Sequence, residues 1–457
     1  MNTRRFDFAP DFVWGVATSS YQIEGAAAED GKGLGNWDAF CDRPSAIYEG
    51  HRGDAGADHY RRLGDDLDLI AALGVGAYRF SVSWPRILPE ARGTPNEKGL
   101  DFYDRLVDGL LARGVTPYLT LFHWDAPQAF ERLGGFRNAE SPAWFADFTR
   151  VVARRLGDRV RHYFTLNEPH AFIEGGLRHG RHAPGLTLPL PEVLRAAHHA
   201  LLAHGRSVQV LRAEVKNAWI AMAPVLVSGI PASNTPADVE AASHFTFGQN
   251  GDGLRTTAFW TDPAMGRGYP ADCLRQFGAH MPKFSPSELD LIAQPLDAFG
   301  ANLYDAPLVR AGQDGQPEVV PYPPGSPRTA FDWPVTPEAH YWAVKFAYER
   351  YGKPIVITEN GLSSRDWVGT DGQVRDNERV DFLLRHLSAL ERASREGIPV
   401  LGYFHWSLLD NFEWNHGYRE RFGLVFVDFE TQKRTPKESY RVYRESIRAT
   451  RSPRTTD

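Results

Sequence analysis

Two glutamates stand at the ends of apolar segments, where a pair of carboxyl groups could act together on one bond. Glu359 follows the β-branched run 355–357, and Asn360 comes directly after it. Such a run is typical of a strand that is buried on both faces. Glu168 ends the apolar segment 161–167 in the same way, and the proline that follows it prevents further strand pairing. Either glutamate alone could simply cap the next segment, but two of them at one edge of a sheet would supply a two-carboxylate mechanism.

The ends of the predicted strands also supply polar and aromatic side chains. These side chains are Gln22, Arg79, His123, Trp124, Asn167, Asn302, Tyr304 and Trp406. The nearest approach to metal-ligand spacing is His123 with Asp125, and a structural role is the favoured interpretation of Asp125. We therefore expect neither a metal nor another cofactor.

The elements that must position these residues alternate along nearly the whole chain. Strands are predicted at 12–18, 77–84, 115–121, 161–167, 219–227, 296–304, 354–360 and 399–406. Segments with apolar residues at three- and four-residue steps predict helices at 58–73, 99–113, 141–156, 191–216, 337–351, 377–395 and 436–449. The alternation predicts an α/β fold, a single (β/α)8 TIM barrel with extended βα loops and reacting groups at the carboxyl ends of its strands.

Two stretches are less regular than the rest of the chain. Segment 229–295 shows helical pieces near 238–249 and 286–292. Segment 309–335 is rich in Gly and Pro, so it is predicted to be a loop, and it carries Trp333. Because there is no linker or repeat beyond the alternation, we expect one catalytic domain over 1–457.

The composition narrows the class of protein further. A hydrophobic fraction of 42% with 24% charged residues is ordinary for a globular protein, and a net charge of −6 gives no nucleic-acid or membrane footprint. Cys41 and Cys273 give no disulfide framework and are interpreted as free thiols in a reducing compartment. The start of the sequence lacks an apolar run after its arginines, so we expect no signal peptide and a cytoplasmic protein.

Six segments, each at the end of a predicted strand, resemble glycoside hydrolase family 1, the β-glucosidase family. They occur in order at 12–25, 78–81, 121–125, 165–169, 357–361 and 406–414. The resemblance covers essentially the whole chain and implies a retaining β-glycosidase, a hydrolase that works through a covalent glycosyl-enzyme. It assigns the nucleophile to Glu359 and the acid/base to Glu168, and retention requires their carboxyl groups to lie about 5–5.5 Å apart.

The same resemblance implies the supporting residues. Arg79, expected on a neighbouring strand, and Tyr304 would hold Glu359 ionised, and Asn302 belongs to the catalytic set. The substrate-binding set comprises Gln22, His123, Trp124, Asn167, Trp333, Trp406, Glu413, Trp414 and Phe422, with Trp406 as the stacking platform and Trp333 at the leaving-group side. Two departures from the family pattern, His170 and Leu303, affect the leaving-group preference. His170 could line that side of the site or simply pack.

The expected substrates are neutral: terminal β-glucosides, including the cello-oligosaccharides of cellulose degradation, and also β-fucosides or β-galactosides. A carboxylate such as Glu413 near O4 and O6 would repel a phosphate on O6, which disfavours a 6-phospho-β-glycosidase. A non-catalytic sugar-binding barrel is the other alternative, and it is disfavoured because both glutamates are present. A phosphate-dependent barrel enzyme would need a Gly-rich cradle that segment 407–410 does not provide. The oligomeric state stays open.

Overall fold

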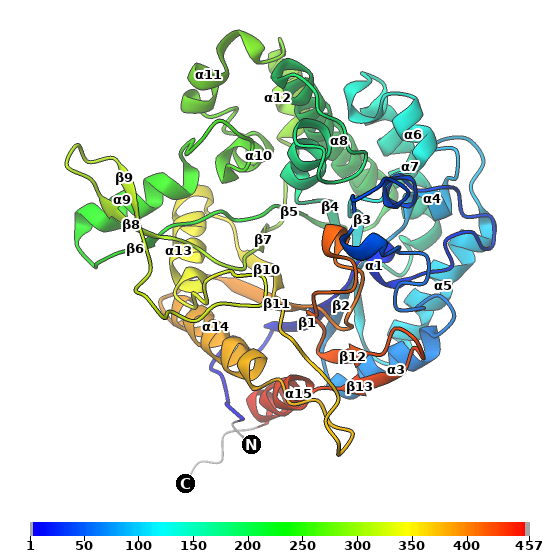
Figure 1. Cartoon of the computed structure of the whole chain (residues 1–457). Coiled ribbons are helices and arrows are strands. Elements are labelled where there is room, and N and C mark those ends of the chain that lie inside the picture. The colour runs from blue at the N-terminus through cyan, green and yellow to red at the C-terminus, as the bar shows by residue number, and fades with distance from the viewer. Residues whose placement is uncertain (1–2, 453–457) are drawn as a thin grey trace.

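A barrel of parallel strands lies at the centre of the molecule (Figure 1). The computed structural model describes residues 3–452. Neighbouring strands of the main sheet follow the order β5-β4-β3-β2-β1-β11-β10-β7, and every pair in it is parallel. The strands are β1 (Val13–Ala17), β2 (Ala77–Ser81), β3 (Thr116–Phe122), β4 (His162–Asn167), β5 (Trp219–Ala223), β7 (Phe299–Asn302), β10 (Ile355–Asn360) and β11 (Val400–Trp406).

Backbone hydrogen bonds between the segments that contain β5 and β7 close this sheet into a barrel. Asp297 N donates to Ile220 O, and Asn302 N donates to Pro224 O, each at 2.9 Å. Gly300 permits the approach, because a Cβ at this position would lie 2.3 Å from the carbonyl oxygen of Met222. The predicted TIM barrel is therefore confirmed.

The helices pack outside the barrel strands (Figure 1). Those that follow successive strands are α3 (Leu63–Leu73), α5 (Glu97–Leu111), α7 (Ser141–Leu156), α8 (Leu190–Glu214), α13 (Ala339–Tyr351), α14 (Asn377–Arg395) and α15 (Glu438–Arg451). The segment after β5 forms α9 (Pro236–Phe247), α10 (Thr257–Ala264), α11 (Ala271–Phe277) and α12 (Pro286–Ile292). Shorter helices in the loops are α1 (Ser20–Ile23), α2 (Asn36–Cys41), α4 (Trp84–Ile87) and α6 (Gln128–Arg132). The last helix ends at Arg451. The predicted domain also includes residues 1–2 and 453–457, which lie outside the described part of the chain.

Several predicted boundaries are wrong for identifiable reasons. The helix expected to start at residue 58 starts at Leu63, because Asp58 has a φ of 52° that a helix does not allow. The strand expected over 219–227 stops at Ala223, since Pro224 has no N–H to donate.

The segment 309–335 is not simply a loop. It begins with an antiparallel hairpin of β8 (Leu308–Ala311) and β9 (Pro317–Val320), and β8 also pairs with β6 (Ile230–Pro231). The turn between β8 and β9 contains Gly315 with a φ of 76°. These turn residues resemble those of an ordinary loop, so the hairpin was not predicted. The structure contains two further unpredicted features: a second hairpin, β12 (Val425–Val427) with β13 (Arg434–Pro436), and a π-helical turn at Ala171–Arg178.

The hydrophobic core has an inner and an outer part. Inside the barrel, small side chains such as Ala17 and Ala221 alternate with the aromatic rings of Tyr118, Phe164 and Phe404. A larger cluster fills the space between the strands and the surrounding helices. Because the inner cluster reaches Trp406 and Phe422, the barrel core forms the floor beneath the carboxyl ends of the strands.

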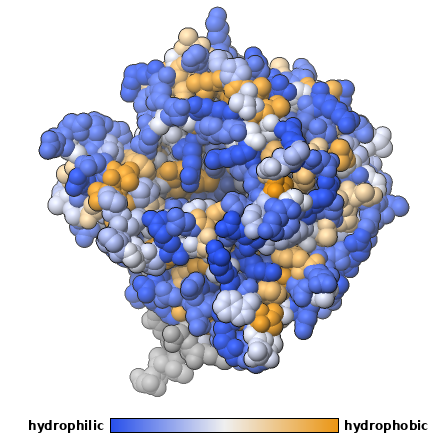
Figure 2. Space-filling view, viewed as in Figure 1, coloured by the Kyte–Doolittle hydropathy of each residue, from blue (hydrophilic) through white to orange (hydrophobic). Residues whose placement is uncertain are grey.

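Within residues 3–452, no helix is both long and apolar enough to cross a membrane. In the same part of the chain, no group of His, Cys, Asp and Glu side chains is arranged to hold a metal ion. The surface is largely hydrophilic on the face shown in Figure 2, and a hollow opens near its centre.

Candidate active site

Glu168 and Glu359 line the same cavity, whose volume is about 630 Å³. Glu359 is the fifth residue of β10 and is only 3% exposed. Glu168 comes directly after β4 and has a φ of 47°, so the chain turns sharply where the strand ends. Both glutamates therefore meet at the carboxyl end of the barrel, as their positions after apolar strands predict.

Arg79 and Tyr304 hold the carboxylate of Glu359 from two sides. The Arg79 guanidinium donates to Oε1 at 2.6 Å, and the Tyr304 hydroxyl donates to Oε2 at 2.8 Å. Arg79 is fully buried and also donates to Asn167 Oδ1 at 2.6 Å. The expected contact is present, but the expectation that Arg79 lies on a neighbouring strand is wrong. Its strand β2 is separated from β10 by β1 and β11, so Arg79 reaches across the barrel interior.

Asn302, the last residue of β7, links the two halves of the site. Its Nδ2 donates to Glu168 Oε1 at 2.9 Å and to Asn167 Oδ1 at 3.0 Å. A hydrogen bond with Asn302 also favours the ionised form of Glu359. One amide thus links the two carboxyl groups, and both line the same cavity.

The two carboxyl groups differ in their affinity for a proton. Burial, followed by the negative charge of Glu359, raises the pKa of Glu168 to about 8. Burial also raises the pKa of Glu359, but the charge of Arg79 and the hydrogen bonds from Arg79 and Tyr304 oppose that rise. Glu359 therefore ionises first, and Glu168 keeps its proton near neutral pH.

A third acid, Glu413, lines the cavity beside this pair. Burial raises its pKa to about 8, and the charges of Glu359 and Glu168 act in the same direction. Gln22 donates to Glu413 Oε2 at 3.2 Å, and it also donates to Asn411 Oδ1 at 2.9 Å. The Gln22 amide is therefore engaged within the protein and orients Glu413 from behind.

The other residues predicted from the sequence fall into two groups. Those that line the cavity with the three acids are His123, Trp124, Tyr304, Trp333, Trp406, Trp414 and Phe422. Gln22, Arg79, Asn167 and Asn302 lie behind the lining and contact its members. All of these residues lie in or directly behind the cavity wall, but their sequence positions do not distinguish the lining from its support.

Aromatic rings form a large part of the cavity wall. Trp124 packs on Trp414 with ring centroids 4.4 Å apart, and His123 stacks on Trp406 at 5.6 Å. Trp333, which also lines the cavity, lies 5.4 Å from the ring of Tyr304. Flat apolar faces next to carboxyl and amide groups suit a pyranose, which has C–H faces and a rim of hydroxyls.

Several lining residues were missed because they come from loops. They include Arg181, His182, Arg255, Asp305, Phe331 and His416. No hydrophobic periodicity marks these loop positions, so only the folded chain brings them together. His170 also lines the cavity, which is the first of the two interpretations that its sequence position allowed. Burial lowers its pKa well below the usual range, and the nearby charges of Arg255 and Arg181 lower it further.

Comparisons with known proteins point to one family. A family model described as "Glycosyl hydrolase family 1" matches residues 4–452. Beta-glucosidase A of Thermotoga maritima is 41% identical over 442 residues, which cover 96% of this chain and 97% of that protein. The bifunctional beta-D-glucosidase/beta-D-fucosidase of Bifidobacterium breve is 39% identical over 464 residues, covering 96% of this chain and 98% of its own.

A solved structure gives the same result for the fold. The Thermotoga maritima beta-glucosidase in complex with glucoimidazole has a TM-score of 0.89 and 40% sequence identity to this chain. The match covers 97% of this chain and 99% of the solved one. The likeness therefore includes the loops around the cavity as well as the barrel.

Proposed function

The chain belongs to glycosyl hydrolase family 1 and is a glycoside hydrolase, and from this premise we propose that it removes terminal β-D-glucosyl residues with retention of configuration. One observation carries the proposal. Arg79 and Tyr304 hold the carboxylate of Glu359, whereas the carboxyl group of Glu168 has a pKa of about 8. Both groups contact Asn302 in one cavity. Such a pair can supply a nucleophile and an acid to the same glycosidic bond.

In the first step Glu359 attacks the anomeric carbon while Glu168 donates its proton to the glycosidic oxygen. The bond from the anomeric carbon to the leaving group breaks, and an ester to Glu359 forms. Arg79 and Tyr304 keep the attacking carboxylate ionised and fix its direction. Asn302 holds the carboxyl group of Glu168 towards the same space.

In the second step Glu168 changes from acid to base, because Glu359 has lost its negative charge. Once Glu359 is an ester, its negative charge no longer raises the pKa of Glu168. Glu168, now ionised, accepts a proton from water, which attacks the anomeric carbon and breaks the ester bond. The product therefore leaves with the configuration of the substrate, and one residue serves as acid and then as base.

The preference for a neutral sugar follows from Glu413. We assign it to O4 and O6 of the non-reducing sugar, where a carboxyl group oriented by Gln22 can contact two hydroxyls. A phosphate on O6 would be buried beside Glu413 and exposed to the negative charge of Glu359, the same charge that helps to raise the pKa of Glu413. The 6-phospho-β-glycosidase alternative is therefore not favoured. Activity on β-fucosides is supported by the relative named for both activities, and a carboxyl group at O4 can accept the epimeric hydroxyl of a β-galactoside.

The leaving-group side lies towards Trp333 and His170. Trp333 packs against Tyr304 and Phe331, so its ring lies near the catalytic pair at the wall of the cavity. We assign it to the first sugar or aryl group beyond the broken bond, as in a cello-oligosaccharide. His170 contributes a neutral polar ring beside it.

We also propose one catalytic domain over 1–457 and a reducing compartment such as the cytoplasm. Support for the domain comes from the single barrel and from a family match that spans 4–452. Support for the compartment comes from Cys41 and Cys273, which are both buried and unpaired.

The decisive experiment replaces each glutamate by alanine and adds azide. We expect Glu359→Ala to lose activity on p-nitrophenyl β-glucoside by about 10⁴-fold or more, because the nucleophile is gone. Azide should then attack the anomeric carbon directly and give an α-glucosyl azide, whose configuration NMR determines.

Glu168→Ala provides the matched control. Its glycosyl-enzyme should form from a substrate with a good leaving group, and azide should then yield a β-glucosyl azide. An α-azide from Glu168→Ala, with none from Glu359→Ala, would show that the two roles are reversed.

A further inference from the structure

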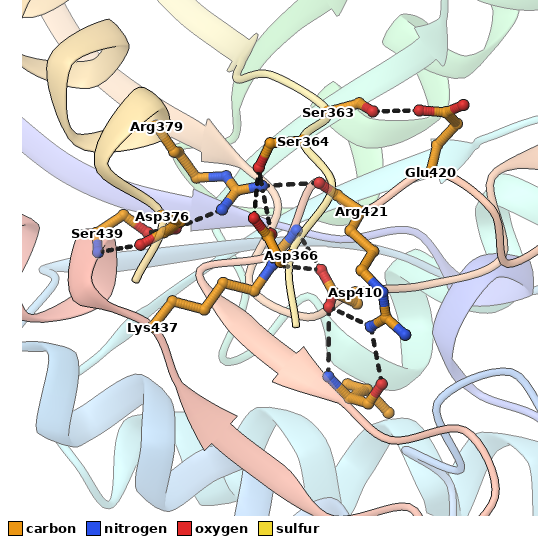
Figure 3. A network of polar contacts seen from close by, with 12 residues as sticks. Ser363, Ser364, Asp366, Asp376, Arg379, Asp410, Glu420, Arg421, Lys437 and Ser439 are labelled. Carbon is orange, nitrogen blue, oxygen red and sulfur yellow. Dashed lines mark hydrogen bonds and ion pairs between the residues drawn. The ribbon is translucent and has the colours of Figure 1, made fainter. Parts of the chain in front are cut away.

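A buried network of ion pairs lies next to the active-site loops (Figure 3). It joins the carboxylates of Asp366, Asp376 and Asp410 to the cationic groups of Arg379, Arg421 and Lys437. The side chains of Lys437, Arg379, Asp376 and Asp410 are 0% exposed. Positive and negative groups balance, so each depends on its partners in place of water.

Lys437 joins the two halves of this network. Its ammonium group lies 2.5 Å from Asp366 Oδ2 and 2.7 Å from Asp410 Oδ1. Lys437 immediately precedes α15, and its own backbone N donates to Leu424 O at 2.9 Å. A side chain near the end of the sequence is thereby fixed between two loops that leave β10 and β11.

Asp410 closes the loop that binds the sugar, residues 407–424, hereafter the sugar-binding loop. Besides Lys437, its carboxylate accepts from Arg421 at 2.6 Å and from Gly423 N at 3.0 Å. The contact is close, since a Cβ on Gly423 would lie 2.1 Å from the backbone N of Asp410. One carboxylate thus binds the start of the loop to its end.

The residues between these two points line the cavity. Glu413, Trp414 and Phe422 all belong to the sugar-binding loop and face the catalytic pair. Their positions therefore depend on how Asp410 closes the loop.

The other half of the network belongs to the loop after Glu359. Arg379 donates to Asp366 Oδ2 at 2.9 Å and to the backbone carbonyl oxygen of Arg421 at 2.8 Å. Ser364 N donates to the same carbonyl oxygen at 3.2 Å. Figure 3 shows these side chains converging between the two loops. The strand that carries Glu359 and the sugar-binding loop are therefore held against each other.

We propose that Lys437 is a positioning residue for the hydrolysis, which acts by fixing Glu413 of the sugar-binding loop relative to Glu359. This inference rests on the function proposed above. Without the ammonium group of Lys437, the buried carboxylates of Asp366 and Asp410 lose the cation that lies between them. Like charges repel, so the loop that carries Asp410 moves away from the loop that carries Asp366.

The test compares two substrates in Lys437→Met. A β-xyloside has no hydroxymethyl group at C5, so it cannot use a contact at O6, whereas a β-glucoside can. We expect kcat/KM on p-nitrophenyl β-glucoside to fall on the order of 100-fold, mainly through KM, the loss that a displacement of about 1 Å can cause. On the corresponding xyloside the fall should be smaller, so the glucoside-to-xyloside ratio decreases about tenfold.

Arg350→Met is the matched control. Arg350 donates to the buried Asp262 at 2.5 and 2.9 Å, between α13 and α10 and away from the cavity. Its removal also takes both of these hydrogen bonds from a buried carboxylate, so it should lower the melting temperature, yet the substrate ratio should stay that of the parent. A similar unchanged ratio in Lys437→Met would overturn the proposal and leave Lys437 with a structural role alone.

Asp410→Asn decides the question if Lys437→Met does not fold. It keeps the side-chain shape and removes the charge that Lys437 binds, so we expect the same decrease in the ratio. An unchanged ratio in this variant would likewise reject the inference. The parent enzyme separates the two hypotheses: an inactive parent would contradict the proposed function, whereas an active parent with unchanged ratios contradicts only the role of Lys437.

Discussion

At the scale of single residues, Glu168 and Glu359 share burial but differ in their partners. Glu359 has a guanidinium and a phenol on its two oxygens, whereas Glu168 accepts one amide hydrogen bond from Asn302. The difference follows from two other parts of the barrel: Arg79 of β2 reaches across the interior to Glu359, and Tyr304 follows β7, which pairs with β10. Two chemically identical side chains thereby obtain opposite protonation states.

The pH dependence should report the acid. In the proposed mechanism Glu168 donates a proton in the first step, so activity requires its protonated form, and that form is lost as the pH rises through its pKa of about 8. We expect kcat/KM on p-nitrophenyl β-glucoside to fall above about pH 8. Arg255 lowers this pKa through its charge, so Arg255→Met should move the alkaline limb to higher pH.

The measurement is kcat/KM from pH 5 to 10 for the parent and for Arg255→Met. Lys283→Met, at a position outside the cavity lining, provides the control for the loss of one positive charge. Two results would contradict the assignment of the alkaline limb to Glu168. One is a shift to lower pH in Arg255→Met, and the other is an equal shift in both variants.

Residue types at strand ends were enough to predict the acids, because an apolar run that stops at a glutamate fixes where that glutamate lies. They were not enough to predict that Gln22 lies behind the cavity lining, where its amide donates to Glu413 and Asn411. Arg181 and Arg255 could not be predicted at all, since each stands in a loop without periodic pattern. Their approach to the cavity depends on tertiary packing, which local sequence does not encode.

At the scale of elements, the close approach of β10 and β11 sets the geometry of the site. A Cβ on Gly361 would lie 1.8 Å from the carbonyl oxygen of Trp406, so the two strand ends can meet only with glycine there. Glu359 lies two residues before Gly361, and Trp406 ends β11. A change in this one contact therefore displaces Glu359 and a wall of the cavity together.

Gly361→Ala should accordingly damage both stability and activity. Overpacking of this kind costs about 1–3 kcal/mol, and a shift of Glu359, the proposed nucleophile, can lower kcat on the order of 100-fold. Thermal unfolding and steady-state kinetics measure the two effects. Gly64→Ala is the control: this exposed glycine at the start of α3 has open space for a Cβ, so the variant should gain about 0.4–1 kcal/mol and keep full activity. Unchanged kinetics in Gly361→Ala would show that the strand ends adapt.

Elements with strong periodicity were predicted well, and those defined by turns were not. The helix predicted over 377–395 has the same limits in the structure, because its apolar stripe is long and regular. The β8–β9 hairpin was missed, since Val319 is half exposed and its turn residues resemble an ordinary loop. Short strands of this kind are stabilised by pairing with distant segments, here β6, and not by their own sequence.

At the scale of the whole molecule, the barrel is completed by the two ends of the described chain. The first strand, β1, pairs with β2 on one side and with β11 on the other. The last helix, α15, packs beneath it, where the Tyr443 hydroxyl donates to Gly15 O at 2.9 Å and its ring lies 5.8 Å from that of Trp14. Because Lys437 precedes the same helix, the segment that secures β1 also carries the ion pairs of the sugar-binding loop.

Loss of the packing under β1 should therefore unfold the barrel and abolish activity in one transition. Tyr443 is fully buried, so Tyr443→Phe should cost about 1 kcal/mol through the lost hydrogen bond, and Tyr443→Ala about 3–5 kcal/mol through the cavity it leaves. Circular dichroism and residual activity, followed over the same temperature range, measure the coupling. Tyr48→Phe, at an exposed tyrosine, should leave the melting temperature unchanged. Activity in Tyr443→Ala that persisted above the temperature at which the helical signal is lost would show that α15 unfolds independently. The proposed coupling between the packing of β1 and the sugar-binding loop would then be rejected.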